Sequence, residues 1–298
     1  MNKIPFILST DWWTDCDDAV AVRLAARAHN EGKINFLGAC LNAAAPYALA
    51  SLDAFLRLEG IETLPIAIDL DANDFTGTPS YQKKFAHHPS RFRENPEGEN
   101  PVSFYRRLLA GSKEKVEIAE IGFPQTLIQL LTSSPDESSP LTGMELVKEK
   151  VAHLWVMAGK WDKNGEKEHN FCNNARSRKA AKMLCDQWPT PITLLGFEVG
   201  ITVVTGKHLK DNDHLKELMV YHGSENGRYS WDPMLIHLFL MRTPENAGYR
   251  AVTGRARVDE ETGCNFFEED ENGPHRYVIK VEPDSYYENA IDSMIESK

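Results

Sequence analysis

Short apolar runs and amphipathic segments alternate along the first 70 residues of the chain. The apolar runs cover residues 4–8, 34–41 and 64–68 and are typical of buried strands. The segments between them have apolar residues at helical spacing, which predicts helices over 17–30 and 46–59. A glycine follows each of these segments closely and suits a helix end. Strands that alternate with helices indicate β-α-β units and a parallel sheet.

The same alternation returns after a long segment that has no sustained period. Residues 70–100 are rich in Asn, Gly, Pro and Arg, and a loop of this length is usually functional or disordered. The later elements are predicted in this order: helix 102–109, strand 116–121, helices 124–131 and 143–150, strand 153–157, helix 175–187, strand 191–195, and helices 212–220, 232–241 and 283–296. Period-two alternation over 249–258 and 276–281 predicts an antiparallel pair. The fold class that we expect is therefore α/β, with an open, mostly parallel, doubly wound sheet, flanking helices and a small antiparallel addition near the C-terminus. We expect one domain over residues 1–298.

Composition narrows the class of protein. The chain has 298 residues and a net charge of −11, which disfavours nucleic acid and anionic membranes as partners. No apolar run approaches the roughly 20 residues that span a bilayer, and the N-terminus leads into a strand rather than a secretion signal. The five cysteines include no C-x-x-C pair, which argues against a disulfide framework and a thiolate zinc site. We therefore expect a cytoplasmic protein.

Four aspartates crowd into the stretch S-T-D-W-W-T-D-C-D-D-A-V at residues 9–20. The stretch follows the first predicted strand, and ligands of α/β sheets bind beyond the carboxyl ends of the strands. Oxygen donors without His or Cys suit Ca²⁺ or Mg²⁺. Asp17 and Asp18 would also be ordinary in the first turn of a helix, where the helix dipole favours negative charge. That alternative does not account for Asp11 and Asp15, so the stretch predicts a metal site.

Two other interpretations of the acidic residues are disfavoured. A phosphotransferase of the haloacid dehalogenase type also begins with a strand followed by Asp-x-Asp. Here Trp13 stands where the second carboxylate of that motif would be. The acidic run at 259–271 lacks the spacing of an EF-hand, and its E-E-T-G and E-E-D-E-N-G segments are typical of exposed hairpin turns.

The stretch at 9–20 resembles the N-terminal motif of the nucleoside hydrolases, the inosine–uridine-preferring N-ribohydrolases, in its longer form D-x-D-x-G-T-D-x-D-D-A. It departs from that motif at Ser9 and Trp13, where the family has Asp and Gly. Weaker matches follow in the family's order: F-L-G-A-C-L-N at 36–42, L-P-I-A-I at 64–68, I-G-F-P-Q-T at 121–126, W-V-M-A-G at 155–159, E-H-N at 168–170, P-I-T-L-L-G-F-E-V at 191–199 and S-W-D-P at 230–233. The likeness covers about residues 4–240, and the ordered set is more specific than any single motif.

The resemblance implies calcium-dependent hydrolysis of the N-glycosidic bond of a ribonucleoside or a related N-riboside. Asp11 would bind Ca²⁺ and act as general base toward a calcium-held water. The other calcium ligands would be Asp18, Asp232 and the backbone carbonyl of Gln125. The sugar hydroxyls would be held by Asp17, Asn42, Glu168 and Asn170, with Asn164 as a further contact. Asp15 has no counterpart in the shorter family motif, and its role stays open.

Trp231 is the most informative departure, because the family often has there a His that protonates the leaving base. An indole is no general acid at neutral pH, so Trp231 would either stack on a substrate ring or pack in the core. His222 is a candidate substitute acid, with a solvated surface histidine as the alternative. His169 replaces a family Phe and is expected to fill space, while His87 and His88 are expected to be solvated.

Three functional hypotheses remain open at this point. The first is a calcium-dependent nucleoside hydrolase, whose carboxylates would stabilise the cationic sugar that forms as the bond breaks. The second is a divergent hydrolase of another glycoside. The third is a non-catalytic protein that binds a nucleoside or sugar. Each takes a small-molecule partner, and the sequence leaves open whether the chain forms a homo-oligomer.

Overall fold

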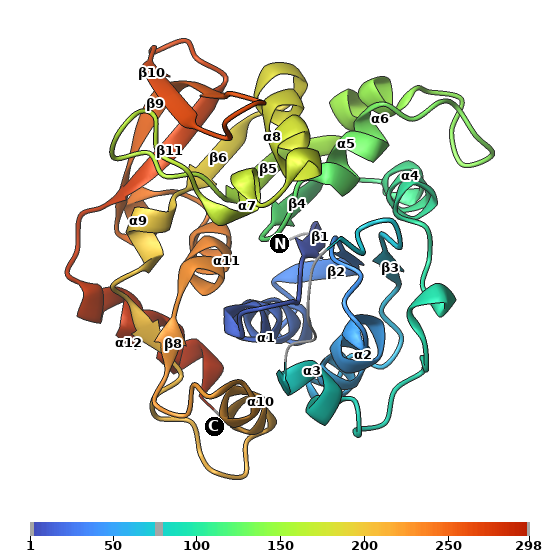
Figure 1. The fold of residues 1–298 in the computed structure, drawn as a ribbon, viewed down its shortest axis with the longest axis vertical. Helices are drawn as coiled ribbons and strands as arrows, with labels where there is room; N and C mark the ends of the chain where they lie inside the picture. Colours follow the sequence, from blue (N-terminus) through green and yellow to red (C-terminus); the bar gives the residue numbers. More distant parts are fainter. Residues whose placement is uncertain (1–2, 75–79, 297–298) are drawn as a thin grey trace.

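The computed structural model describes residues 3–74 and 80–296. Within them, one nine-stranded sheet has the strand order β10-β9-β11-β6-β5-β4-β1-β2-β3 (Figure 1). The strands of this sheet are β1 Ile4–Thr10, β2 Ile34–Leu41, β3 Ile66–Ile68, β4 Val116–Glu120, β5 Val151–Met157, β6 Ile192–Leu195, β9 Tyr249–Val258, β10 Asn265–Glu269 and β11 His275–Lys280. In spatial order, the seven strands β3, β2, β1, β4, β5, β6 and β11 pair in parallel with their neighbours. Strand β9 pairs antiparallel with β11, and β10 pairs antiparallel with β9 at the edge of the sheet. The predicted α/β class is confirmed.

Helices cover both faces of the sheet (Figure 1). The core on one face includes side chains of α1, α2, α11 and α12, and the core on the other includes side chains of α4, α5, α6 and α8. Consecutive side chains of β1 alternate between these cores, since Phe6 and Leu8 belong to the first and Ile7 to the second. The helices are α1 Asp17–Asn30, α2 Ala48–Leu58, α3 Ser80–Phe85, α4 Pro101–Gly111, α5 Gln125–Leu131, α6 Gly143–Lys150, α7 His169–Cys172, α8 Ala175–Gln187, α9 Phe197–Gly200, α10 His214–His222, α11 Trp231–Met241 and α12 Asp284–Ile295.

Several helix ends follow directly from local sequence. Asn100 accepts the backbone N–H groups of Val102 and Ser103 at the start of α4, which satisfies donors that have no partner inside the helix. Thr142 and Glu145 form a reciprocal capping box at the start of α6. Asn174 likewise accepts the backbone N–H of Ser177 at the start of α8, and such caps fit the agreement of the predicted bounds 143–150 and 175–187 with the structure. Helix α1 also has its predicted bounds, 17–30, without a side-chain cap but with two aspartates in its first turn.

Several short elements were not predicted from the sequence, and helix α3 and strand β10 are two of them. Helix α3 lies inside the segment expected to have no structure, and residues 75–79 of that segment lie outside the described residues. The expected antiparallel pair is confirmed as β9 and β11, but β10 also pairs with β9. Strand β10 lies within the acidic run interpreted as turns. Only Asn265 and Phe267 of this strand are buried, so its pattern is too short to distinguish from a loop.

The strand order indicates where a ligand would bind, at the carboxyl ends of the central strands. From β1 the chain proceeds to β2 and β3 on one side, whereas β4 joins β1 on the other side. Such a change of direction opens a crevice at the carboxyl ends of the strands. The loop between β1 and α1, which carries the aspartates, lies there. Among the described residues, no helix has both the length and the apolar character needed to cross a membrane.

Candidate active site

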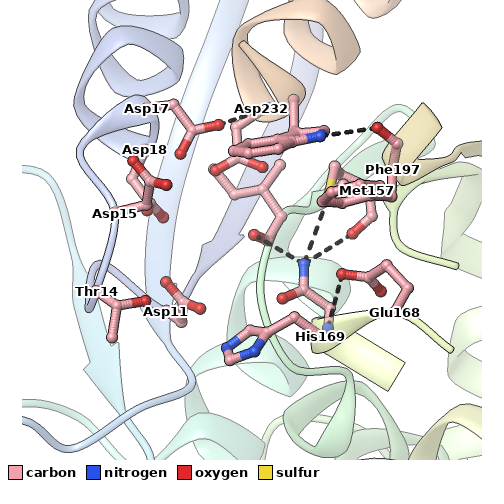
Figure 2. A pocket seen from close by; sticks show the side chains of 13 residues that line it. Asp11, Thr14, Asp15, Asp17, Asp18, Met157, Glu168, His169, Phe197 and Asp232 are labelled. Carbon is pink, nitrogen blue, oxygen red and sulfur yellow. Dashed lines mark hydrogen bonds between the residues drawn. The ribbon is translucent and has the colours of Figure 1, made fainter. Parts of the chain in front are cut away.

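A pocket opens at the carboxyl ends of the central strands, between the β1–α1 loop and the segments that follow β5 and β6 (Figure 2). One side is acidic and comes from the β1–α1 loop, the start of α1 and the start of α11. The opposite side comes mainly from the segments after β4, β5 and β6. The lining residues are Asp11, Thr14, Asp15, Asp17, Asp18, Ile121, Met157, Glu168, His169, Asn170, Phe197, Trp231 and Asp232.

The acidic wall contains a group of three close carboxylates. Asp17, Asp18 and Asp232 are all buried, and they offer oxygens that lie within 4.8 Å of one another. The backbone N–H of Asp232 also donates to the Asp17 carboxylate at 3.1 Å. These residues meet because α11 packs on α1, with the first turns of both helices at the pocket. The predicted ligands Asp18 and Asp232 therefore come together, with Asp17 beside them and Asp11 elsewhere in the lining.

The electrostatics of this wall favour a cation. Burial raises the pKa of the Asp11, Asp17, Asp18 and Asp232 carboxyl groups well above the usual range, and their mutual repulsion raises it further. Among the described residues, no Lys or Arg forms an ion pair with any of these four. Buried carboxylate oxygens within 4.8 Å of one another fit a hard divalent ion such as Ca²⁺.

Asp15 differs from the other aspartates because the protein supplies its counter-charge. Arg228, from the short strand β8 Arg228–Tyr229, donates Nε and Nη2 to the two carboxylate oxygens at 2.8 and 2.5 Å. β8 pairs with β7 Val204–Thr205 in a small antiparallel sheet of two strands. Asp15 thus lines the pocket while joining the aspartate loop to this small sheet.

Trp12 holds the aspartate loop in an unusual conformation. Its φ of 44° is in the left-handed region, which is uncommon for a bulky residue. The side chain is fully buried, and its indole N–H donates to the Ser51 hydroxyl at 2.9 Å. Its backbone N–H lies 3.2 Å from Asp18 Oδ1. The conformation is therefore fixed by surrounding contacts, and it helps to aim Asp18 into the pocket.

The opposite wall is organised by hydrogen bonds within the protein. Glu168 precedes α7 and accepts the backbone N–H groups of Gly159 at 2.8 Å and Asn170 at 2.9 Å. Burial raises the pKa of Glu168 to about 7, although these N–H bonds lower it. The Asn170 side chain donates to the Met157 carbonyl at 2.9 Å. Glu168 and Asn170, both predicted to hold the sugar, therefore line the pocket in fixed positions.

Aromatic residues complete the lining. Trp231 donates its indole N–H to the Phe197 carbonyl at 2.9 Å, and the two rings stack with centroids 5.3 Å apart. His169 stacks on Trp13 with ring centroids 6.2 Å apart. Burial lowers the pKa of His169, which favours the neutral ring and makes it a poor proton reservoir. Trp231 thus lines the pocket, and His169, expected only to fill space, does so as well.

Four predicted residues are not among the described residues that line the pocket. Asn42 donates to Glu120 at 2.7 Å and to Ser9 at 3.1 Å. Gln125 donates to the Asn42 carbonyl at 2.6 Å. Asn164 exchanges two hydrogen bonds with the backbone of Phe267, at 2.7 and 3.3 Å. The contacts of Asn164 lie outside the pocket, and the roles implied for Asn42 and Gln125 stay predictions.

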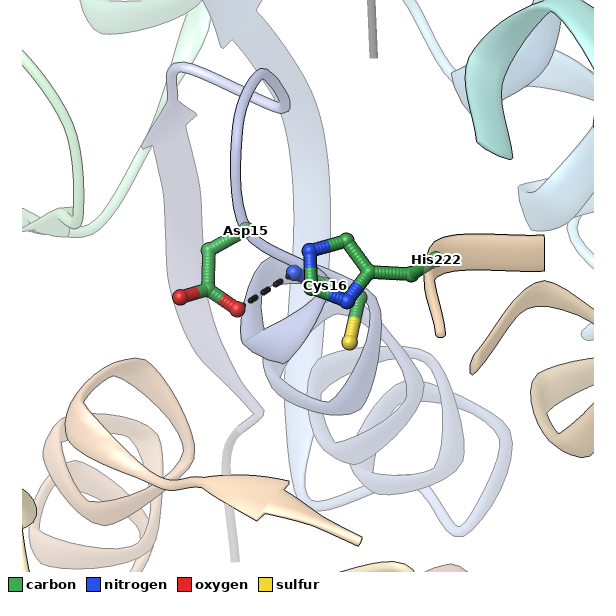
Figure 3. A group of neighbouring side chains, drawn as sticks. All are labelled: Asp15, Cys16 and His222. Carbon is green, nitrogen blue, oxygen red and sulfur yellow. Dashed lines mark hydrogen bonds between the residues drawn. The ribbon is translucent and has the colours of Figure 1, made fainter. Parts of the chain in front are cut away.

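The fourth is His222, which lies beside Asp15 and Cys16 (Figure 3). Its Nε2 is 3.0 Å from the Thr14 carbonyl oxygen, and its Nδ1 is 2.8 Å from the Ser224 hydroxyl. These contacts anchor the aspartate loop to the end of α10. They give no support to His222 as the acid for the leaving group.

Some contributors were not found from the sequence. Glu120, at the end of β4, is buried and receives N–H groups from Asn42 and Gly122. Burial raises its pKa to about 8. Ile121, Met157 and Phe197 line the pocket. Each lies at or just beyond the end of a predicted strand, so strand ends were the available signal.

Comparisons with known proteins were made for sequence and for structure. No family model matches this chain, and no curated protein sequence does. A plant nucleoside hydrolase superposes with a TM-score of 0.74 at 15% identity, covering 99% of each chain. An inosine-uridine preferring nucleoside hydrolase from Bacillus anthracis gives a TM-score of 0.71 at 13% identity, covering 98% of this chain and 99% of its own.

A more distant similarity concerns an effector protein. The type III effector protein XopQ, solved in complex with adenosine diphosphate ribose, gives a TM-score of 0.67 at 13% identity. The superposition covers 98% of this chain and 93% of XopQ. At such identities the similarity concerns the fold. The chain therefore has the fold of the nucleoside hydrolases, which confirms the fold predicted from the ordered motifs.

Proposed function

We propose that the protein is a calcium-dependent hydrolase that cleaves the N-glycosidic bond of a ribonucleoside or a related N-riboside. The observation that carries this proposal is the pocket itself. Buried carboxylates of Asp17, Asp18 and Asp232 lie within 4.8 Å of one another, and Asp11 shares their wall. Polar groups suited to a sugar face them from the opposite wall.

The donor set supports a hard divalent cation. Asp17, Asp18 and Asp232 would hold it, whereas the resemblance implies Asp11, Asp18, Asp232 and the Gln125 carbonyl. When bound, calcium would supply positive charge that lowers the pKa of a water molecule and orients it. Calcium titration of the Asp17→Asn and Asp11→Asn variants distinguishes the two ligand sets. Weaker calcium binding by Asp17→Asn would support the first set, and weaker binding by Asp11→Asn would support the second.

Side chains of the protein would then accept the proton of the water and bind the sugar. Asp11 would accept the proton of the attacking water as general base. Glu168 and Asn170 would hold sugar hydroxyls, and the surrounding carboxylates would stabilise the positive charge that develops on the sugar ring. The Trp231 and Phe197 rings offer an apolar surface for the leaving base.

A panel of nucleosides tests the proposal. We expect release of free base that stops with a chelator and returns with Ca²⁺. A second candidate function is binding of a ribose-containing ligand without turnover. It is favoured by Trp231, which cannot protonate a leaving base, and by His169, whose pKa is lowered by burial. Tight binding with no product would establish that alternative. Retained calcium binding with inactivity on every nucleoside would instead indicate another glycoside.

We further propose that the chain acts in the cytoplasm as one domain over residues 1–298. All five cysteines are free in the structure, as expected in a reducing compartment. Fractionation of the expressing cells would test the compartment, and a single cooperative unfolding transition would support one domain.

A further inference from the structure

A second group of metal-binding side chains lies outside the pocket, between α3 and α10, which pack side by side (Figure 1). His87 and His88 lie in the turn that follows α3, and Glu217 lies on α10. One ligand atom from each of the three lies within 4.8 Å of the other two. His88 Nε2 is 3.0 Å from a Glu217 oxygen, and His87 Nε2 is 3.9 Å from the other.

Neighbouring groups orient two of these three side chains. His87 Nδ1 is 2.5 Å from the Lys84 carbonyl oxygen, so its proton belongs on Nδ1 and Nε2 is left as the electron-pair donor. Metal-bound histidines commonly donate their other N–H in this way. The Tyr221 hydroxyl donates to Glu217 Oε1 at 2.7 Å and orients the carboxylate. His87 and Glu217 are thus oriented by neighbouring groups, whereas His88 Nε2 now donates its N–H to Glu217 and would give up this proton on binding a metal.

No nearby Lys or Arg of the described residues competes with a metal for the Glu217 carboxylate. Among the described residues, no Lys or Arg forms an ion pair with its carboxylate. The ammonium of Lys84 lies over the Tyr221 ring, 5.4 Å from its centroid. The side chains of His87, His88 and Glu217 are 56%, 20% and 30% exposed, so water can complete the coordination.

We propose that His87, His88 and Glu217 form a second metal site, which takes a divalent transition metal of the zinc class. Two imidazole nitrogens and one carboxylate suit Zn²⁺, whereas Ca²⁺ prefers oxygen donors only. The bound metal joins the turn after α3 to α10. These elements already meet beside the aspartate loop, where the Tyr81 ring lies 6.0 Å from His222 and 5.9 Å from Trp12. The site therefore stabilises the support of that loop, whatever reaction the pocket performs.

Zinc titration by calorimetry tests this site in the full-length protein, with excess Ca²⁺ present to occupy the carboxylate pocket. We expect one equivalent of Zn²⁺ to bind the wild type and His208→Ala, a matched control that removes an exposed histidine elsewhere. His87→Ala and His88→Ala should lose this binding while keeping the wild-type circular dichroism spectrum. Tyr221→Phe should bind about tenfold more weakly, since it loses only a supporting hydrogen bond.

Two further measurements give readouts that do not depend on activity. Co²⁺ at this site should show visible absorption bands that disappear in His88→Ala. Zn²⁺ should raise the melting temperature of the wild type but not that of His87→Ala. Equal zinc affinity in the wild type and both histidine variants would overturn the proposal, as would a folded wild type that takes up no zinc beside calcium.

Discussion

Asp232 and Glu168 face the same pocket, yet their surroundings differ. Glu168 receives backbone N–H groups from Gly159 and Asn170, so the opposite wall is satisfied by the protein alone. The acidic wall places Asp17, Asp18 and Asp232 against one another, with few donors between them. The polar groups of one wall are therefore fixed by the protein itself, whereas the carboxylates of the other wall could bind a metal ion. If the proposed function holds, metal binding and sugar binding should therefore be separable by substitutions in one wall or the other.

The largest effect is expected from Asp11→Asn. If Asp11 removes the proton from water, turnover should fall by about 10²- to 10⁴-fold, which is typical of a lost general base. The amide keeps the size of the side chain and an oxygen that can accept the Trp13 N–H, so the fold should survive. The measurement is the rate of base release at saturating nucleoside, with circular dichroism as the control. Near-normal turnover would transfer the role to another carboxylate.

Glu120→Gln extends the comparison, because Glu120, like Glu168, receives N–H donors while burial raises its pKa, here to about 8. A carboxyl pKa that folding raises from 4.5 to about 8 favours the folded state most at low pH. The unfolding free energy should therefore fall by a few kcal/mol as pH rises from about 4.5 to 8. Glu120→Gln should lack this part of the pH dependence. Denaturant unfolding measured at several pH values across this range tests the prediction. The same pH dependence of the unfolding free energy in both proteins would contradict it.

Adding and removing calcium should affect variants of the two walls differently. Calcium at a hundredfold excess over its dissociation constant should stabilise the wild type by about 2.7 kcal/mol. We expect Asp232→Asn to lose this calcium-dependent shift in thermal unfolding, and Glu168→Gln to keep it. If Glu168→Gln also lost the shift, the opposite wall would take part in metal binding and the comparison would fail.

A smaller effect is expected for Glu168→Gln in catalysis. In the proposed function Glu168 accepts a sugar hydroxyl through a charged oxygen, and the neutral amide of Gln would accept it more weakly. The amide would also lose one of the two backbone N–H contacts that orient the group, since only its oxygen accepts. Loss of such a charged hydrogen bond costs about 2 kcal/mol, or roughly 30-fold in kcat/KM. Steady-state kinetics with calcium present measure this loss. A decrease as large as that of Asp11→Asn would show that Glu168 does more than hold the sugar.

The sequence was informative where one short pattern determines the structure. Helix α1 was predicted at its observed bounds because its apolar spacing is clear and its acidic first turn marks the start. Asp11, Asp17 and Asp18 were found because they follow the first strand at the edge where α/β sheets bind ligands. Asp232 required the resemblance, since no local pattern connects it with residue 17.

Contacts between distant segments were beyond local patterns. The pairing of Asp15 with Arg228 joins residues 213 positions apart, and each is an ordinary surface charge in the sequence. Helix α3 and strand β10 are too short for periodicity to reveal them. His87 and His88 were expected to be solvated, since Glu217 comes near them only after α10 has packed against α3.

The hydrogen bond from Asp232 to Asp17 has a consequence for folding kinetics. It joins residues 215 positions apart, so Asp232 becomes a neighbour of Asp17 and Asp18 only when α11 docks on α1. Before that step the charge of Asp232 is remote and adds nothing to the repulsion within the aspartate loop. If docking follows the transition state, calcium should slow unfolding and leave the refolding rate almost unchanged. The ion would then bind only after the chain has folded, and it would stabilise the folded state by slowing unfolding.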